Sequence, residues 1–503
     1  MPALMIPPLA MLRRVGFVIL FAMFVVVATI AICWRGPWYD EFYSFYLVRP
    51  DVPLSSLWPA WLRDNHPPLF YALAWGWSRS IAWTGITGTV EGLRTLNLAI
   101  LAAVVFAFAR LARADAWFAR IVWFDCLALA ATFPALDRID QLRSYFLSFA
   151  LTALVLPLLA RQIRGRTGKH ESLILGVMLA LAFSVHLVTT VIVAALVAAS
   201  LTYLVLARRW NDARRLVVIA TLALVPFAVT MAVQLSTIVA NTRVFWIPGG
   251  FSAARWAIEI ETNDALGANP VLALVALTGL GALVVGARRR DPDARATLVL
   301  LATLAAGLAL ALGLLVAVHL HRPLLITRYL IALDPVLALI LALCADAATR
   351  RLPAMATATL DALILVVTGL VLHAHLAATV AKPSWDGTGA AIAEMVRTCP
   401  GITVHPDMRW NSMTLEMPPR DNREVVPFSY RFVARRFGFS LAPEGTHGLS
   451  RTCPTVFWTE HVATQHPTAR AVIDGLRASG YPIRSGRMER IADGWILITP
   501  PTG

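Results

Sequence analysis

Charged residues, and lysines above all, are scarce in this chain of 503 residues. Only 15% of the residues are charged, against about 25% in an ordinary soluble domain, and Lys169 and Lys382 are the only lysines. Hydrophobic residues make up 58% of the chain, and the mean hydropathy is +0.66. This composition excludes an ordinary cytosolic enzyme and a disordered chain. It indicates a polytopic membrane protein.

The net charge of +14 rests almost entirely on arginine, but the arginines form no continuous basic stripe. They separate apolar runs long enough to cross a bilayer, about 20 residues each, so nucleic acid is not an expected partner. The predicted spans are 14–33, 93–112, 117–135, 144–160, 172–187, 189–207, 215–237, 270–287, 296–318, 328–346 and 356–377.

Arginine clusters fall between alternate pairs of these eleven spans. Cytoplasmic loops of membrane proteins carry the excess of arginine and lysine, and all the clusters lie on one side if the N-terminus is cytoplasmic. The clusters lie at 13–14, 110–120, 161–169, 208–215, 288–295 and 350–351. The first apolar run has no cleavage site, so we expect a retained helix, a cytoplasmic N-terminus and an outer C-terminus.

Residues 67–83 do not fit this alternation as a further span. The segment is short and carries Trp75, Trp77, Trp83 and Arg79, and tryptophan favours the membrane interface. We interpret it as an interfacial helix on the outer face. The first outer loop is then 34–92, and residues 1–379 form the transmembrane domain.

Residues 380–503 are predicted to form a soluble outer domain. Short apolar runs at 402–405, 455–458 and 494–499 indicate strands, and 468–480 indicates a helix, which together predict a small α/β fold. Cys399 and Cys453 each precede a predicted strand within the tripeptide Thr-Cys-Pro. A disulfide between them and two free thiols are left as equal alternatives.

Signatures of metal, nucleotide and hydrolase sites are missing from the sequence. It contains no HExxH, CxxC, P-loop, dinucleotide fingerprint or G-x-S-x-G motif. The histidine pairs at 319 and 321 and at 373 and 375 have no third ligand at a useful spacing. We therefore expect no metal and no cofactor.

Polar residues instead gather in the segments that this topology places outside. They occur as Asp40-Glu41 after the first span, Arg63-Asp-Asn-His-Pro-Pro-Leu-Phe-Tyr71, Glu91-Gly-Leu-Arg94, Gln141-Leu-Arg-Ser-Tyr145 and Arg328-Tyr-Leu. A carboxylate near the hydrocarbon boundary is costly unless it is paired or functional. Their convergence on one face predicts a site there.

These motifs, in this order, resemble the GT-C class of membrane glycosyltransferases over residues 10–380. The resemblance is greatest to the group that holds protein O-mannosyltransferases, lipid A aminoarabinose transferases and Rgt-type glycosyltransferases. It implies transfer of a sugar from a polyprenyl-phosphate donor to an acceptor hydroxyl on a lipid or surface glycan. It implies a protein that lies in the inner (cytoplasmic) membrane, with membrane lipids as partners. The reaction would take place at the outer face of this membrane, and the C-terminal domain would be periplasmic.

The resemblance also implies roles for single residues. Asp40 would be the catalytic base of an inverting displacement and Glu41 a supporting acid. Arginine suits the phosphate of the leaving group through permanently charged, bidentate contacts, so Arg143 and Arg328 are substrate-binding candidates or, alternatively, snorkelling side chains. Tyr145 and Tyr329 are expected to bind phosphate or sugar, or else to belong to an interfacial aromatic belt.

His66 occupies the histidine of the family's His-Pro-Pro step, and Asn65 stands beside it where some relatives use a lysine. We expect both to contact a substrate, with phosphate left to arginine or histidine. Asp137 and Asp140 are expected to pair with Arg138 and Arg143 or, alternatively, to form an acidic edge of the site. A lid over the donor is predicted at 243–250.

Two other classes of function remain open at this stage. A polysaccharide polymerase or ligase shares the lipid-linked donor, but a large outer loop late in the chain is expected of it, whereas the largest loop here comes first. A transporter or flippase of lipid-linked sugars needs polar residues near the membrane midplane. Such residues are few in the middle spans, His186 and Gln234 being the exceptions.

Overall fold

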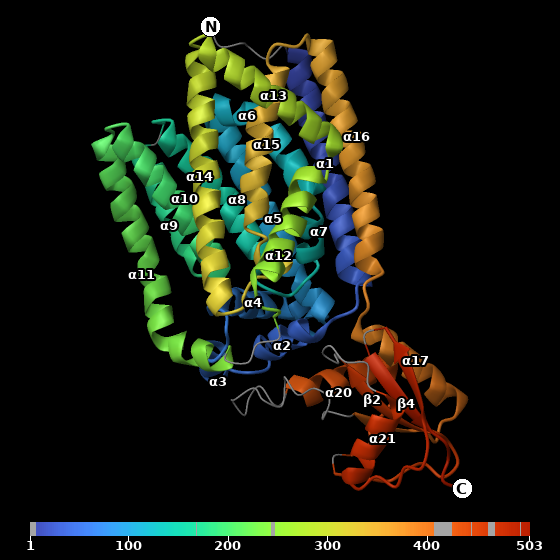
Figure 1. Ribbon diagram of the computed structural model, residues 1–503. Coiled ribbons are helices and arrows are strands. Elements are labelled where there is room, and N and C mark those ends of the chain that lie inside the picture. The colour runs from blue at the N-terminus through green and yellow to red at the C-terminus, as the bar shows by residue number, and fades with distance from the viewer. Residues whose placement is uncertain are drawn as a thin grey trace. The chain divides into compact units, whose positions relative to one another are not determined.

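The computed structural model describes residues 7–166, 168–242, 247–406, 425–443, 445–460, 468–492 and 494–503. Contacts divide the chain into two units, Met1–Ile32 with Trp61–Val380, and Cys33–Ala60 with Ala381–Gly503. We call them the helical unit and the mixed unit (Figure 1). The predicted boundary at residues 379 and 380 lies at the second junction, whereas Cys33–Ala60, predicted to lie in an outer loop of the transmembrane domain, groups with the C-terminal residues.

A helix overlaps each of the eleven predicted spans. These helices are α1 (Pro7–Trp34), α5 (Val90–Ala114), α6 (Ala116–Ala131), α8 (Tyr145–Ile163), α9 (Lys169–Phe183), α10 (Leu187–Leu206), α11 (Trp210–Asn241), α13 (Pro270–Arg288), α14 (Pro292–His321), α15 (Leu333–Thr349) and α16 (Ala354–Val380). In the described residues, eight helices are long and apolar enough to cross a membrane. A ninth span arises if α6 and α7 (Phe133–Ile139), bent by 68°, are counted together. α9 and α15, with 15 and 17 residues, are shorter.

Local sequence signals explain where several helices begin. Asn269 and Asp291 accept hydrogen bonds from the first backbone N–H groups of α13 and α14, and each precedes a proline at the first helical position. Proline is tolerated there because its missing N–H would have no partner within the helix. α4 (Leu69–Ser80), in the predicted interfacial segment, has 12 residues and is therefore too short to cross the bilayer.

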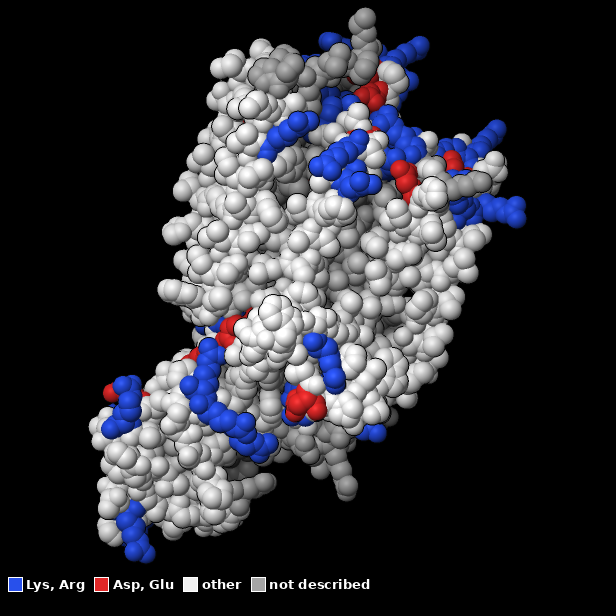
Figure 2. All heavy atoms as spheres, turned by 180° about the vertical axis from the view of Figure 1, so that it is seen from behind, with Lys and Arg blue, Asp and Glu red and all other residues white. Residues whose placement is uncertain are grey.

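Close helix packing builds the core of the helical unit around α8, which is buried over nearly its whole length. α13 packs on α15, α10 on α14, and α6 on α15. Gly279 of α13 permits one close approach, because a Cβ there would lie 1.7 Å from the backbone oxygen of Cys344 in α15. Figure 2 shows a broad band of this unit without charged side chains and a concentration of Lys and Arg toward one end. The unit is a polytopic membrane bundle.

The mixed unit contains a sheet in the order β1-β2-β4-β3. β1 (Thr403–Pro406) runs parallel to β2 (Thr455–Glu460), whereas β4 (Gly494–Thr499) is antiparallel to both β2 and β3 (Arg487–Ile491). β3 is the strand that the sequence analysis did not predict, since its residues RMERI are largely polar. Cys399 and Cys453 form a disulfide with Cα atoms 6.0 Å apart.

Helices pack beside this sheet, namely α17 (Trp385–Thr398), α20 (Val425–Phe437) and α21 (Ala469–Ala478). The short helix α2 (Tyr39–Leu47) belongs to the same unit because its aromatic side chains meet those of α17 and α20. The ring of Phe42 lies 5.1 Å from that of Trp385 and 5.5 Å from that of Phe432. α3 (Leu54–Leu62) runs across the boundary between the units.

Candidate functional site

Four aromatic rings from distant parts of the chain meet in the helical unit. His66 precedes α4, Tyr145 begins α8, His186 is the N-cap residue of α10, and Tyr329 ends the short helix η3 (Thr327–Tyr329). The His186 ring lies 5.0 Å from Tyr329, 5.3 Å from His66 and 5.9 Å from Tyr145. We call these four residues the ring cluster.

Arg143 brings a positive charge to the ring cluster. Its Nη2 lies 3.5 Å from Nε2 of His66, and its guanidinium carbon lies 6.0 Å from the centre of the Tyr145 ring. Its Nη1 donates a hydrogen bond to the Tyr71 hydroxyl at 3.4 Å. Arg143 is buried, so its charge acts where water screens it little.

Asp64 contacts both Tyr71 and His66. The Tyr71 hydroxyl donates to Oδ2 of Asp64 at 2.5 Å, and Nδ1 of His66 lies 3.5 Å from that oxygen. Burial raises the pKa of Asp64, but the hydrogen bond with His66 and the positive charges of His66 and Arg143 lower it more, leaving it at about 2. Asp64 is therefore ionised at neutral pH and orients His66.

Backbone anchors hold the two loops that carry these side chains. Gln234 of α11 donates from Nε2 to the backbone oxygens of Trp61, Asp64 and His66, at 3.0, 3.4 and 3.2 Å. Asn97 of α5 donates from Nδ2 to the backbone oxygens of Ile139 and Gln141, at 2.9 and 2.8 Å. Both donors are buried amides, so the loops before α4 and α8 are fixed by the bundle.

The remaining predicted substrate-binding residues lie near this cluster. The guanidinium carbon of Arg328 lies 5.7 Å from the ring of its neighbour Tyr329. Asn65 is half-buried between Asp64 and His66, and among the described residues its Oδ1 has no hydrogen-bond partner. The structure thus gathers His66, Tyr145, Tyr329 and the arginine candidates at one place in the bundle.

The hydroxyl of Tyr145 is one further group suited to a ligand. Tyr145 is 1% exposed, and no described residue forms a hydrogen bond with its hydroxyl. Leaving a buried hydroxyl without a partner costs free energy, and native proteins seldom do so without reason.

Asp137 forms an ion pair with Arg138, which is part of the pairing expected for the acids of this loop. Asp140, three residues further along the chain than Asp137, is fully buried. Glu261 of α12 (Phe251–Gly267) is also buried, and burial raises its pKa to about 8.

The two predicted catalytic acids lie in the mixed unit. Asp40 and Glu41 occupy the first turn of α2, where Glu41 is fully buried and Asp40 is half-buried. The hydroxyl of Ser44 donates to the backbone oxygen of Asp40 at 3.2 Å. The ring cluster therefore belongs to the helical unit, and α2 belongs to the mixed unit. The predicted lid at 243–250 lies partly outside the described residues.

His186, Gln234, Tyr71 and Asp64 were not among the predicted site residues. The signal for His186 and Gln234 was present, because they are rare polar residues in apolar spans, and such residues are often functional. Their proximity to His66 depends on how α10 and α11 pack, which periodicity alone does not reveal.

One histidine of each pair has structural contacts. Nδ1 of His319 accepts hydrogen bonds from the backbone N–H groups of Leu324 and Leu325, at 3.1 and 3.0 Å. The ring of His375 packs edge-on against Phe133. Across the described residues, no group of three or more His, Cys, Asp or Glu is placed to hold a metal ion.

Comparison with solved structures identifies the fold. The chain is similar to ArnT from Cupriavidus metallidurans in the apo state, with a TM-score of 0.56 and 14% sequence identity over 96% of this chain and 97% of that one. The same enzyme bound to undecaprenyl phosphate gives a TM-score of 0.54 and 13% identity over the same shares. ArnT is a lipid A aminoarabinose transferase of the GT-C class, so the expected GT-C-type fold is confirmed.

Other comparisons add little. An oligosaccharyltransferase from Archaeoglobus fulgidus, solved with zinc and sulfate, gives 12% identity over 87% of this chain and 68% of that one, with a TM-score of 0.42. That score is too low to define a common fold. No protein-family model and no curated protein matches the sequence.

Proposed function

We propose that the protein is a membrane glycosyltransferase that moves a sugar from a polyprenyl-phosphate donor to a hydroxyl of a lipid or surface glycan. The observation that carries the proposal is the ring cluster with Arg143, in a bundle whose fold is that of ArnT. A buried arginine next to histidine and tyrosine donors suits a phosphate, and undecaprenyl phosphate is the lipid bound by ArnT.

In this proposal Arg143 and Arg328 bind the phosphate that leaves with the lipid. Positive charge held in a poorly hydrated site stabilises the negative charge that develops on this phosphate as the glycosidic bond breaks. His66, held by Asp64, and the hydroxyls of Tyr145 and Tyr329 complete the contacts with phosphate and sugar. Asn65, whose amide oxygen has no partner among the described residues, accepts from a substrate hydroxyl.

Asp40 is proposed as the base that takes the proton of the acceptor hydroxyl, with Glu41 as a supporting acid. α2 follows the end of α1 after four residues, so the chain itself keeps Asp40 close to the membrane boundary. Attack on the anomeric carbon from the face opposite the phosphate then inverts its configuration. We propose an inner-membrane location, with this chemistry at the outer face and the arginine-rich loops in the cytoplasm.

Transport of a lipid-linked sugar is less well supported. His186 and Gln234 are the polar exceptions in the middle spans, and both lie toward one end of their helices. His186 belongs to the ring cluster, and Gln234 binds the loop that carries His66. A polymerase or ligase would share the phosphate contacts but use another acceptor.

The test uses purified protein, a synthetic polyprenyl-phosphate sugar and acceptor lipid, with transfer followed by mass spectrometry. Glycolipids of a deletion strain complemented with each variant identify the sugar. We expect Asp40→Asn to lower the rate about 10²- to 10⁴-fold, the usual contribution of a general base. Asp51→Asn, which alters an exposed acid of the same loop, is the matched control and should transfer at the wild-type rate.

If Asp40→Asn transfers normally, the base is another group. If the wild type releases no sugar to any acceptor but moves the labelled lipid across vesicles, the enzyme proposal fails and transport is supported.

A further inference from the structure

A cavity of about 180 Å³ lies at the opposite end of α8 from the ring cluster. It is lined by Ile163, Arg164, Arg166, Tyr203, Arg209 and Ala296. These residues come from the end of α8 and the loop after it, from α10 and α14, and from the N-cap position of α11. α8 has 19 residues, so about 28 Å of helix separates this cavity from Tyr145. It is therefore distinct from the proposed donor site.

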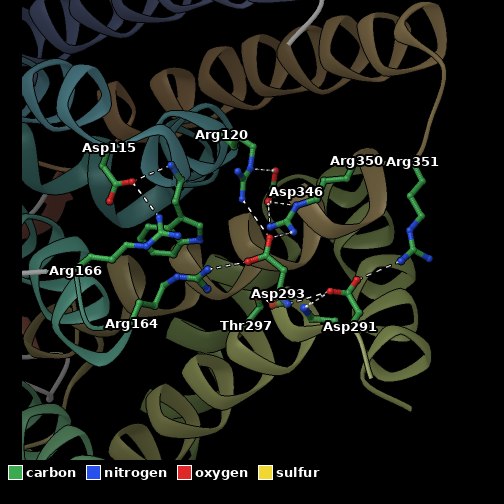
Figure 3. A network of polar contacts seen from close by, with 12 residues as sticks. Asp115, Arg120, Arg164, Arg166, Asp291, Asp293, Thr297, Asp346, Arg350 and Arg351 are labelled. Atoms are coloured by element: carbon green, nitrogen blue, oxygen red, sulfur yellow. Dashed lines mark hydrogen bonds and ion pairs between the residues drawn. The ribbon is translucent and has the colours of Figure 1, made fainter. Parts of the chain in front are cut away.

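Around the cavity Asp293 and Asp115 are each shared by more than one arginine (Figure 3), whereas Arg209 pairs with Asp212 at 2.6 Å. Asp293 contacts Arg350 at 3.0 Å, Arg164 at 3.1 Å and Arg120 at 3.8 Å. Asp115 is bound closely by Arg161 and only at 3.4 Å by Arg166, whose side chain is 45% exposed. Glu171, Asp212, Asp291 and Asp346 take part as well, so the ion pairs of this region join seven arginines to six carboxylates and leave one positive charge in excess.

Arg164 gives a second, independent indication. Its side chain is 5% exposed and its guanidinium carbon lies 4.8 Å from the centre of the Trp117 ring. Among the described residues only its Nη2 has an acceptor, while Nε and Nη1 are buried without one. Burying guanidinium nitrogens without acceptors costs free energy. After a modest shift of the Arg164 side chain, an anion in the cavity would provide these acceptors.

The chemistry of the lining selects the class of anion. Guanidinium groups match the oxygens of a phosphate, and the Tyr203 side chain adds an apolar ring with a hydroxyl. The volume corresponds to about six water molecules, which accommodates a phosphate with part of its ester substituents. Basic pockets between the ends of membrane helices are typical binding places for phospholipid headgroups. We propose that this cavity binds the phosphodiester headgroup of an anionic phospholipid.

The test measures lipid retained by the purified full-length protein, using native mass spectrometry after titration with phosphatidylglycerol or, as the zwitterionic comparison with no net charge, phosphatidylcholine. We expect selective retention of phosphatidylglycerol by the wild type. Arg166→Gln should weaken it about fivefold, the usual effect of one cation near a lipid surface. Ala296→Phe should weaken it at least as much, because it fills the cavity without changing charge.

The matched control is Arg289→Gln, which removes another exposed charge, next to α13 and outside the cavity, and should bind as the wild type does. Equal weakening by Arg166→Gln and Arg289→Gln would mean diffuse attraction and overturn the proposal, as would normal binding by Ala296→Phe. Displacement of the lipid by 10 mM inorganic phosphate would support recognition of phosphate. If the protein binds inorganic phosphate but retains no phosphatidylglycerol, the cavity takes free phosphate and the proposal of a lipid ligand is overturned. Thermal unfolding without lipid identifies a variant that fails to fold.

Discussion

The two ends of α8 carry polar clusters that differ in how their charges are paired. At the Arg161 end, arginines and aspartates at the ends of α6, α8, α14 and α15 form two groups of ion pairs, one around Asp115 and one around Asp293. At the Tyr145 end, Arg143 meets histidine and tyrosine rings, and the hydroxyl of Tyr145 has no partner among the described residues.

This difference indicates which polar groups contribute to stability and which contribute to ligand binding. Buried charges that pair with one another hold helices in place, and breaking such a pair leaves a costly unpaired charge. Polar groups with incomplete partners contribute less to stability but are ready to bind a ligand. The comparison therefore predicts that substitution of Arg161, whose charge is fully paired, lowers stability, whereas substitutions at the Tyr145 end lower activity.

The largest effect on stability is expected for Arg161→Gln. Arg161 is 8% exposed and pairs with Asp115 and Glu171, so its loss leaves the buried Asp115 carboxylate with a poorer partner. We expect a loss of about 3–5 kcal/mol in the free energy of unfolding, measured by denaturant in detergent. The control Arg397→Gln removes an exposed pair with Glu394 and should change little. If Arg161→Gln unfolds at the same denaturant midpoint as the wild type, the predicted difference between the two ends of α8 is wrong.

Arg143→Gln should produce the reverse pattern. We expect sugar transfer to fall about 10²- to 10³-fold, because a cation stabilising the leaving phosphate is lost. The loss of unfolding free energy should be smaller than for Arg161→Gln. Arg63→Gln, an exposed charge in the neighbouring loop, is the control for activity. A stable, fully active Arg143→Gln enzyme would show that Arg143 does not bind the phosphate and is only a side chain that reaches toward the membrane interface.

Asp64→Asn tests the carboxylate that orients His66. The pKa of Asp64 falls from 3.8 to about 2 on folding, which corresponds to about 2 kcal/mol of stability at neutral pH. Because the folded pKa is the lower one, this contribution is present above pH 4 and disappears as the pH falls through 2. The difference in unfolding free energy between wild type and variant should shrink over that range, and a constant difference would contradict the assignment.

The smallest effect on stability is expected for Tyr145→Phe. Its hydroxyl has no partner among the described residues, so removing it should change the unfolding free energy by less than about 1 kcal/mol. Transfer should nevertheless fall about tenfold if that hydroxyl binds substrate, which is the value of one hydrogen bond. A clear loss of stability with unchanged kcat/KM would place Tyr145 in the packing of the bundle.

Much of the fold could be predicted because the signals are local. A run of apolar residues forms a helix in a membrane wherever it occurs, and each predicted span overlaps one helix of the structure. The lengths were less predictable. α6, α9 and α15 are shorter than a full span, so eight or nine helices meet the criterion and not eleven. β3 was missed because its polar sequence lacks an apolar alternation.

The candidate site was predictable only in part. The motifs around His66, Arg143 and Arg328 pointed to one face, and the structure brings their neighbourhoods together. His186 and Gln234 join them through the packing of α10 and α11, which no local pattern encodes.

The sequence by itself determined the helices, the positions of the arginine-rich loops and the order of the motifs. These follow from hydropathy and from the cost of burying charge, which act on each segment separately. Tertiary structure alone decided which arginine shares which aspartate, and it placed α2 with the aromatic core of the mixed unit. The physical reason is that pairing and packing depend on the spatial approach of residues far apart in the chain. Asp293, for example, meets Arg164 across 129 positions of sequence.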